Sequence, residues 1–183
     1  LFGLGEALLV TSQMGVSPWT ALAQGFSNVT GSGLGLATFI ISVFVLLLWI
    51  PLKQRPGIGT ILNAIIISLT LHYAIPFMPI FEQNILRISQ AILGVFVTGL
   101  GGGIYLIANL GPGARDGLMT GMQRITNFPI AWVRGSIEIM VLTVGWLLGG
   151  VIGLGTIIFA LGIGPCLAIS LTIFGSSKSK SNH

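Results

Sequence analysis

The sequence repeats itself at a constant distance of 96 positions. Glycine-containing landmarks of the first half return in the second half with no gap between them. The matched landmarks are Gly15 with Gly111, Gly25 with Gly121, and residues 57–61 (GIGTI) with residues 153–157 (GLGTI). Both halves are almost wholly apolar, so the repeat indicates a duplicated membrane unit rather than a soluble array. Duplication of this kind is typical of transporter folds, which place a site where the two repeats meet.

The composition excludes a water-soluble domain. Hydrophobic residues make up 53% of the chain and charged residues only 7%, whereas a soluble domain carries roughly 25% charged residues. The eight lysines and arginines are scattered between apolar segments, so nucleic acid is not an expected partner. The single cysteine, Cys166, excludes an internal disulfide. The sequence shows no metal-ligand cluster and no nucleophile–base motif, so we expect neither an enzyme nor a metal or cofactor.

Six apolar segments predict an all-α polytopic membrane protein with six transmembrane helices. The segments are residues 1–13, 33–52, 57–78, 88–109, 129–149 and 152–174. The first is shorter than the roughly 20 residues that a crossing needs, so we expect the rest of that helix upstream of Leu1. Two shorter stretches, 18–30 and 114–126, each span only about 20 Å as a helix. We predict that both form short broken or re-entrant helices.

Three crossings per copy predict that the second copy is inverted relative to the first. Basic residues test this expectation because they accumulate on the cytoplasmic side. With six crossings, the basic residues that share one side are Lys53, Arg55, Arg115, Arg124, Lys178 and Lys180. We therefore expect both termini to lie in the cytoplasm. The predicted parts of the chain are repeat 1 (1–78), an external connector (79–87), an inverted repeat 2 (88–175) and a cytoplasmic tail (176–183).

Four segments carry a family resemblance. They are residues 15–19 (GVSPW), 49–63 (WIPLKQRPGIGTILN), 111–121 (GPGARDGLMTG) and 144–156 (VGWLLGGVIGLGT). Together they resemble the bacterial YczE-like integral membrane proteins of the YczE/YyaS/YitT group, over nearly the whole chain. The resemblance implies a fold and little mechanism, because most members are uncharacterised and transport is the usual suggestion. The chain departs from the family pattern at Thr20, where an aspartate is expected, and at Ala114, where a proline is expected.

Two charged residues inside the fifth predicted crossing are the clearest indication of a functional site. Arg134 and Glu138 are four positions apart and so lie on one face of a helix. A charge in a membrane helix costs at least about 2.5–3.5 kcal/mol on insertion scales, so it usually faces a partner or a wet cavity. The pair either binds an anionic or zwitterionic substrate, relays protons, or is a structural ion pair. The equivalent positions of the first copy, Thr38 and Ser42, are uncharged.

The starts of the two short helices provide further candidates. Arg115 and Asp116 open the second one, where free N–H groups and the positive end of the dipole suit anions. A structural or gating role is the favoured interpretation for Asp116, and Arg115 is equally explained by the cytoplasmic excess of arginine. Trp19 and Thr20 occupy the same place in the first copy, and an interfacial anchor is the favoured interpretation of Trp19.

Two polar residues lie within other crossings. Glu6 in the first crossing is a candidate proton or cation site. Asn63 in the third can orient a polar substrate or join helices. Glycine pairs with GxxxG spacing, such as Gly145 and Gly149, indicate tight helix packing, with a homodimer face as the alternative.

The leading hypothesis is a small-molecule transporter or permease with its site at the repeat interface. Its expected partners are the lipid bilayer and a small molecule that the sequence does not identify. The candidate substrate-binding residues are Glu6, Trp19, Thr20, Asn63, Arg115, Asp116, Arg134 and Glu138. Two alternatives stay open: a non-transporting accessory or scaffold protein of a biosynthetic pathway, and a substrate-binding subunit of an energised importer.

Overall fold

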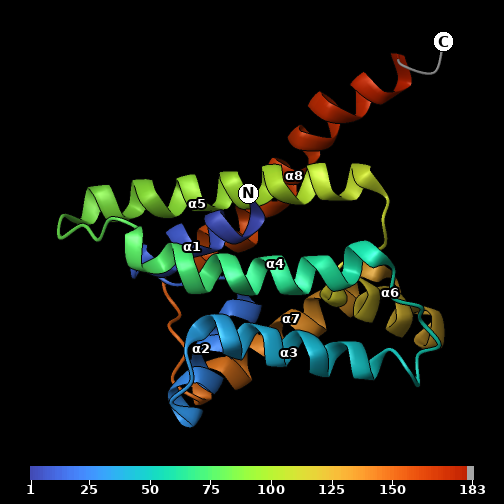
Figure 1. Ribbon diagram of the computed structural model, residues 1–183, viewed down its shortest axis with the longest axis horizontal. Coiled ribbons are helices and arrows are strands. Elements are labelled where there is room, and N and C mark those ends of the chain that lie inside the picture. The colour runs from blue at the N-terminus through green and yellow to red at the C-terminus, as the bar shows by residue number, and fades with distance from the viewer. Residues whose placement is uncertain (181–183) are drawn as a thin grey trace. The chain divides into compact units, whose positions relative to one another are not determined.

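Every regular element in the described part of the chain is a helix (Figure 1). The computed structural model describes the backbone of residues 1–180 and the side chains of residues 1–174. The elements are α1 (Phe2–Ser12), α2 (Pro18–Thr30), α3 (Leu34–Leu48), α4 (Ile58–Ala74), the 3-10 helix η1 (Ile75–Phe77), α5 (Asn84–Ala108), α6 (Ala114–Thr126), α7 (Ile130–Leu147) and α8 (Leu154–Lys180). The side chains of Lys178 and Lys180 and the end of the predicted tail, 181–183, lie outside the described residues.

Four stretches of helix are long and apolar enough to cross a membrane. They are Ile58–Phe77, Asn84–Ala108, Ile130–Leu147 and Leu154–Phe174. Helices α2 and α3 together pass the same test, although a 113° bend separates them, and α1 is a shorter apolar helix. The protein is therefore a helical multi-pass membrane protein with four or five candidate crossings, and a lipid bilayer is its environment.

Helix α3 is shorter than the predicted crossing of residues 33–52. It contains 15 residues and ends at Leu48, so it spans about 22 Å. The chain then turns, and Lys53 adopts a positive φ of 53°. Pro51 accounts for the early end, because proline lacks an N–H and disfavours helical backbone at the residue before it. Apolar composition alone therefore overestimated the length of this helix.

The 96-residue duplication is visible in the helix bounds. The starts of equivalent helices are Pro18 and Ala114, Leu34 and Ile130, and Ile58 and Leu154. Helices α1 and α5 both end on a left-handed residue, Gln13 (φ 55°) and Asn109 (φ 52°). A glycine with φ near 110° follows each of them, Gly15 and Gly111, in a region that other residues rarely adopt. The same turn thus leads into both short helices.

The chain forms two compact units, and each takes segments from both sequence copies. Unit 1 consists of Leu1–Ser17, Tyr73–Asn109 and the chain from Val151 onward. It contains α1, η1, α5 and α8. Unit 2 consists of Pro18–His72 and Leu110–Gly150. It contains α2, α3, most of α4, α6 and α7.

In unit 1, α1 packs against α5 in the antiparallel sense. Gly5 lies against Thr98, and Gly94 lies against Leu9, where an added Cβ would come within 3.0 Å of the leucine side chain. The contacting residue numbers increase along α1 while they decrease along α5, so the two helices are antiparallel. Small residues at the crossing let the two backbones approach closely, as is typical of membrane helices.

Helices α5 and α8 of unit 1 pack in the parallel sense. Gly99 lies against Cys166, and Gly103 lies against Ser170 one turn further along both helices. The Ser170 hydroxyl donates a hydrogen bond of 3.0 Å to the carbonyl oxygen of Leu100. Glycines on one helix thus accommodate the side chains of the other.

In unit 2, each short helix packs against a helix of the opposite copy. Helix α2 lies along α7, with Gly25 against the backbone of Gly145. Helix α6 lies against the end of α3, with Gly117 directly against the indole of Trp49. These contacts place the first turns of α2 and α6 in the interior of the unit, where the candidate site lies.

Candidate functional site

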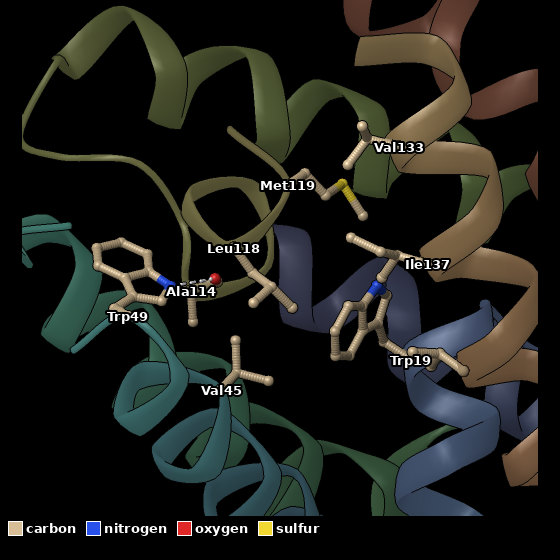
Figure 2. Packing of buried hydrophobic residues seen from close by; sticks show 9 residues of the cluster. Trp19, Val45, Trp49, Ala114, Leu118, Met119, Val133 and Ile137 are labelled. Atoms are coloured by element: carbon tan, nitrogen blue, oxygen red, sulfur yellow. Dashed lines mark hydrogen bonds between the residues drawn. The ribbon is translucent and has the colours of Figure 1, made fainter. Parts of the chain in front are cut away.

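The first turns of α2 and α6 belong to one buried cluster of unit 2 (Figure 2). This cluster, the tryptophan core, consists of Trp19, Val45, Trp49, Ala114, Leu118, Met119, Val133, Ile137 and Val141. Trp19 is the second residue of α2, and Ala114 is the first residue of α6. The first N–H groups of a helix lack intrahelical acceptors, and the helix dipole is positive at this end. The tryptophan core therefore brings two positive helix ends into one buried region.

The two tryptophans of this core use their indole N–H groups differently. The Nε1–H of Trp49 donates a hydrogen bond of 2.9 Å to the carbonyl oxygen of Ala114, so it fixes the start of α6. The Nε1–H of Trp19 has no hydrogen-bond partner among the described residues, although only 5% of this residue is exposed. The guanidinium of Arg115 lies over the Trp19 ring, with 5.4 Å between Cζ and the ring centroid.

Charged side chains surround this pair on α6 and α7. Arg134 Nε lies 3.0 Å from Glu138 Oε1, with 51% and 29% of the two side chains exposed. Burial raises the pKa of the half-buried Asp116 carboxyl above its ordinary value, while the guanidinium groups of Arg134 and Arg115 oppose that rise. Arg134 therefore forms an ion pair with Glu138 within α7 and lies near enough to Asp116 of α6 to affect its pKa. No three His, Cys, Asp or Glu side chains come together to hold a metal ion in the part of the chain that was described.

The structure brings five of the eight predicted site residues together in unit 2. They are Trp19, Arg115, Asp116, Arg134 and Glu138. Thr20 is also buried, in the first turn of α2. Asn63 lies half-buried on α4, and no hydrogen bond joins it to this group within the described residues.

Glu6 belongs to unit 1 instead. It is fully buried on α1, and its Oε2 accepts a hydrogen bond of 2.8 Å from the Ser17 hydroxyl. The carboxylate thus links α1 to the residue that immediately precedes α2. A membrane-embedded carboxylate that accepts a hydrogen bond from a hydroxyl is consistent with a structural role as well as with a proton-binding site.

A cavity of about 450 Å³ lies between α6 and α7. Its lining residues are Met122, Thr126, Phe128, Pro129, Trp132, Val133, Ser136 and Ile137. Val133 and Ile137 also belong to the tryptophan core, so one wall of the cavity is the α7 side of that core. The sequence analysis identified neither this cavity nor the role of Trp49. Apolar residues at helical spacing look the same whether they line a cavity or fill a core.

The comparisons with known proteins agree with this membrane architecture. The DUF6198 family model, described as a family of unknown function, matches residues 1–172. An uncharacterized protein of Haemophilus influenzae is 41% identical over 173 residues, which cover 94% of this chain and 79% of that protein. The uncharacterized membrane protein YczE of Bacillus subtilis is 31% identical over 176 residues, which cover 93% of this chain and 80% of YczE. No solved structure matches the chain. The predicted resemblance to YczE is confirmed, and the chain belongs to the DUF6198 family.

Proposed function

We propose that this protein is a small-molecule transporter of the bacterial inner membrane, built from two inverted three-helix repeats. The observation that carries the proposal is the meeting of two short helices at their N-terminal ends, beside a buried arginine–tryptophan contact. Secondary transporters form their sites from broken helices whose N-terminal ends point at the substrate. Both termini lie in the cytoplasm in this proposal, as the positions of the basic residues predict.

The antiparallel packing of α1 and α5 supports the inversion. Phe2 lies against Gly101, and Gly5 lies against Thr98. At the 96-residue offset, Phe2 corresponds to Thr98 and Gly5 corresponds to Gly101. Exchanging the two copies therefore converts the first contact into the second. A two-fold axis that relates antiparallel neighbours must be perpendicular to both. With α5 crossing the bilayer, that axis lies in the membrane plane, as an inverted repeat requires.

Backbone hydrogen bonds at the start of α4 and α8 show the same exchange. In unit 1, the amide of Gly155 donates to the carbonyl of Met14 at 2.7 Å. In unit 2, the amide of Gly59 donates to the carbonyl of Leu110 at 2.9 Å. Each bond joins the loop of one copy to a helix of the other, 96 positions apart. This pairing supports equivalent roles for the two loops that precede the short helices.

Within unit 2, the Trp19–Arg115 contact supports a site where the two copies meet. Trp19 and Arg115 are 96 positions apart, so they are equivalent residues of the two copies. Two equivalent residues that touch each other must lie at the two-fold axis that relates them. Transporters of this kind bind their substrates near that axis. The proposed substrate site is therefore formed by the first turns of α2 and α6.

A non-transporting accessory protein is the second candidate, and one contact favours it. Arg134 and Glu138 pair with each other, as a structural ion pair would. In that case, replacing both by leucine should leave the stability and the cellular phenotype nearly unchanged, because apolar residues of similar volume replace such pairs well. A transporter that uses the pair should lose flux in the double variant while it remains folded.

The transport proposal is tested with the full-length protein in proteoliposomes. Pooled radiolabelled amino acids and organic acids provide the solutes, and a pH-sensitive dye inside the vesicles reports proton movement. Wild-type protein and Arg124→Gln, which alters an exposed arginine of the same helix, should both support flux. Arg115→Gln should reduce it by roughly tenfold or more. Folded protein that moves neither a solute nor protons would refute the proposal.

The inverted topology has its own test. In a Cys166→Ala background, Lys53→Cys and Arg124→Cys place one thiol after α3 and one at the end of α6. An impermeant maleimide should label both from the cytoplasmic face and neither from outside. Labelling from opposite faces would remove the basis for the inverted repeat.

A further inference from the structure

The indole N–H of Trp19 is one of the buried side-chain polar groups that have no hydrogen-bond partner among the described residues. The residue is 5% exposed, and its Nε1–H meets no acceptor among the described residues. Native structures leave few buried donors unsatisfied, and each such donor calls for an explanation. The neighbouring Trp49 shows that this core can satisfy an indole, since its Nε1–H is bound to Ala114.

The surroundings of this N–H favour an anionic acceptor. Trp19 lies in the first turn of α2, and its ring is covered by the guanidinium of Arg115. The start of α6 carries no side-chain cap, and the positive end of its helix dipole adds to the positive potential there. An arginine, two helix ends and an indole N–H together form a set of donors for a carboxylate or phosphate.

The adjoining cavity defines the rest of the ligand. Figure 2 shows the indole nitrogen of Trp19 directed toward α7, near Ile137. Ile137 and Val133 also line the 450 Å³ cavity between α6 and α7. That volume is in the range of small-molecule sites. Of the lining side chains, only Thr126, Ser136 and the indole of Trp132 carry a polar group. Such a cavity suits an apolar body rather than a sugar or a peptide.

We propose that unit 2 binds an amphiphilic organic anion. Its charged group accepts hydrogen bonds from Trp19 Nε1–H and Arg115 at the start of α6, and its apolar body occupies the cavity between α6 and α7. This inference rests on the proposed transport function, because it names the ligand class of the same site.

The test uses the full-length protein in phosphatidylcholine nanodiscs and follows its four indole N–H signals by ¹⁵N–¹H NMR. Trp19→Phe removes one signal and so assigns it, and the bonded N–H of Trp49 provides an internal reference. Sodium octanoate combines the anion with an apolar chain. Acetate presents the anion alone, and 1-octanol presents the chain alone.

Octanoate should move the Trp19 signal downfield, as a new hydrogen bond to an anion does, while the Trp49 signal stays in place. Acetate should need roughly tenfold higher concentration, and Arg115→Gln should weaken octanoate binding by a similar factor. Trp146→Phe, which alters an exposed tryptophan of α7, should bind octanoate normally. If Trp19→Phe does not fold, Trp49→Phe, Trp132→Phe and Trp146→Phe assign the other three signals and so identify that of Trp19 in the wild-type titration.

Nanodiscs that contain phosphatidylglycerol separate the two sources of the anion. A Trp19 signal already shifted in these discs identifies a lipid headgroup as the anion, whereas a shift only with octanoate identifies a free organic anion. No shift in either case, or an equal shift with octanol, would overturn the inference. Flux without a Trp19 shift would refute the anion-binding inference but not the transport proposal. A shift without flux would leave an anion site and remove the transport proposal.

Discussion

Replacing Trp49 by Phe should weaken the fold more than replacing Trp19 by Phe, although both residues belong to the same core. Both substitutions keep a six-membered ring and remove the pyrrole part of the indole. The loss of apolar volume is therefore similar at the two sites. Only Trp49→Phe also breaks a hydrogen bond, the 2.9 Å contact with the Ala114 carbonyl. The difference between the two variants isolates the contribution of the indole N–H.

The structure sets the size of this difference. Trp49 is 1% exposed and Trp19 is 5% exposed, so the burial terms nearly cancel. Leaving the Ala114 carbonyl without its donor costs about 1–3 kcal/mol. Removing the unsatisfied N–H of Trp19 relieves a desolvation penalty of about 1–3 kcal/mol. We therefore expect the free energy of unfolding to fall by about 2–6 kcal/mol more for Trp49→Phe than for Trp19→Phe.

The measurement is unfolding by SDS in mixed micelles, followed by far-UV circular dichroism. Trp146→Phe serves as the control, because this tryptophan is 61% exposed on α7. Equal losses for Trp19→Phe and Trp49→Phe would refute the reasoning. A larger loss for Trp19→Phe would show that its N–H has a structural acceptor after all.

Three further substitutions test other parts of the packing. Gly135→Ala on α7 adds a Cβ with nothing within 4 Å, and should raise the free energy of unfolding by about 0.5–1 kcal/mol. Gly117→Ala should lower the thermal midpoint, because its Cβ would overlap the Trp49 indole. A thermal scan in detergent compares the two alanine variants. A higher midpoint for Gly117→Ala than for Gly135→Ala would contradict the assigned packing. Ser17→Ala should reduce stability by about 1–3 kcal/mol, since it removes the donor to Glu6. A loss below about 0.5 kcal/mol in the same SDS titration would mean that this bond has no structural role.

The short helices were the most predictable part of the fold. The sequence analysis expected them at 18–30 and 114–126, and the structure has α2 and α6 at those bounds. The signals are local: a serine followed by proline marks the start of α2, and Gly31 with a φ of 69° follows its end. The contact between Arg134 and Glu138 was predictable for the same reason, because it depends only on a spacing of four within one helix.

Contacts between distant segments were not predictable from the sequence. The hydrogen bond from Trp49 to Ala114 joins positions 65 apart, and no local pattern distinguishes Trp49 from Trp19. The predicted repeats, 1–78 and 88–175, likewise follow the order of the chain, whereas each compact unit takes helices from both copies. A duplication in sequence states which residues are equivalent, but not which of them touch.

The two sequence copies differ at the contact between Trp19 and Arg115 in unit 2, and this difference determines which ligand the proposed site can bind. In the proposed inverted arrangement, duplication alone would place identical residues at the two-fold axis, yet the residues in contact are Trp19 from one copy and Arg115 from the other. Two arginines in contact would repel each other, and two tryptophans would leave the site uncharged. The unlike pair keeps one positive charge against an aromatic face, an arrangement that is favourable in itself, and adds an indole donor beside it. In the proposed site, the loss of symmetry at this contact therefore supplies a positive charge and an indole N–H donor.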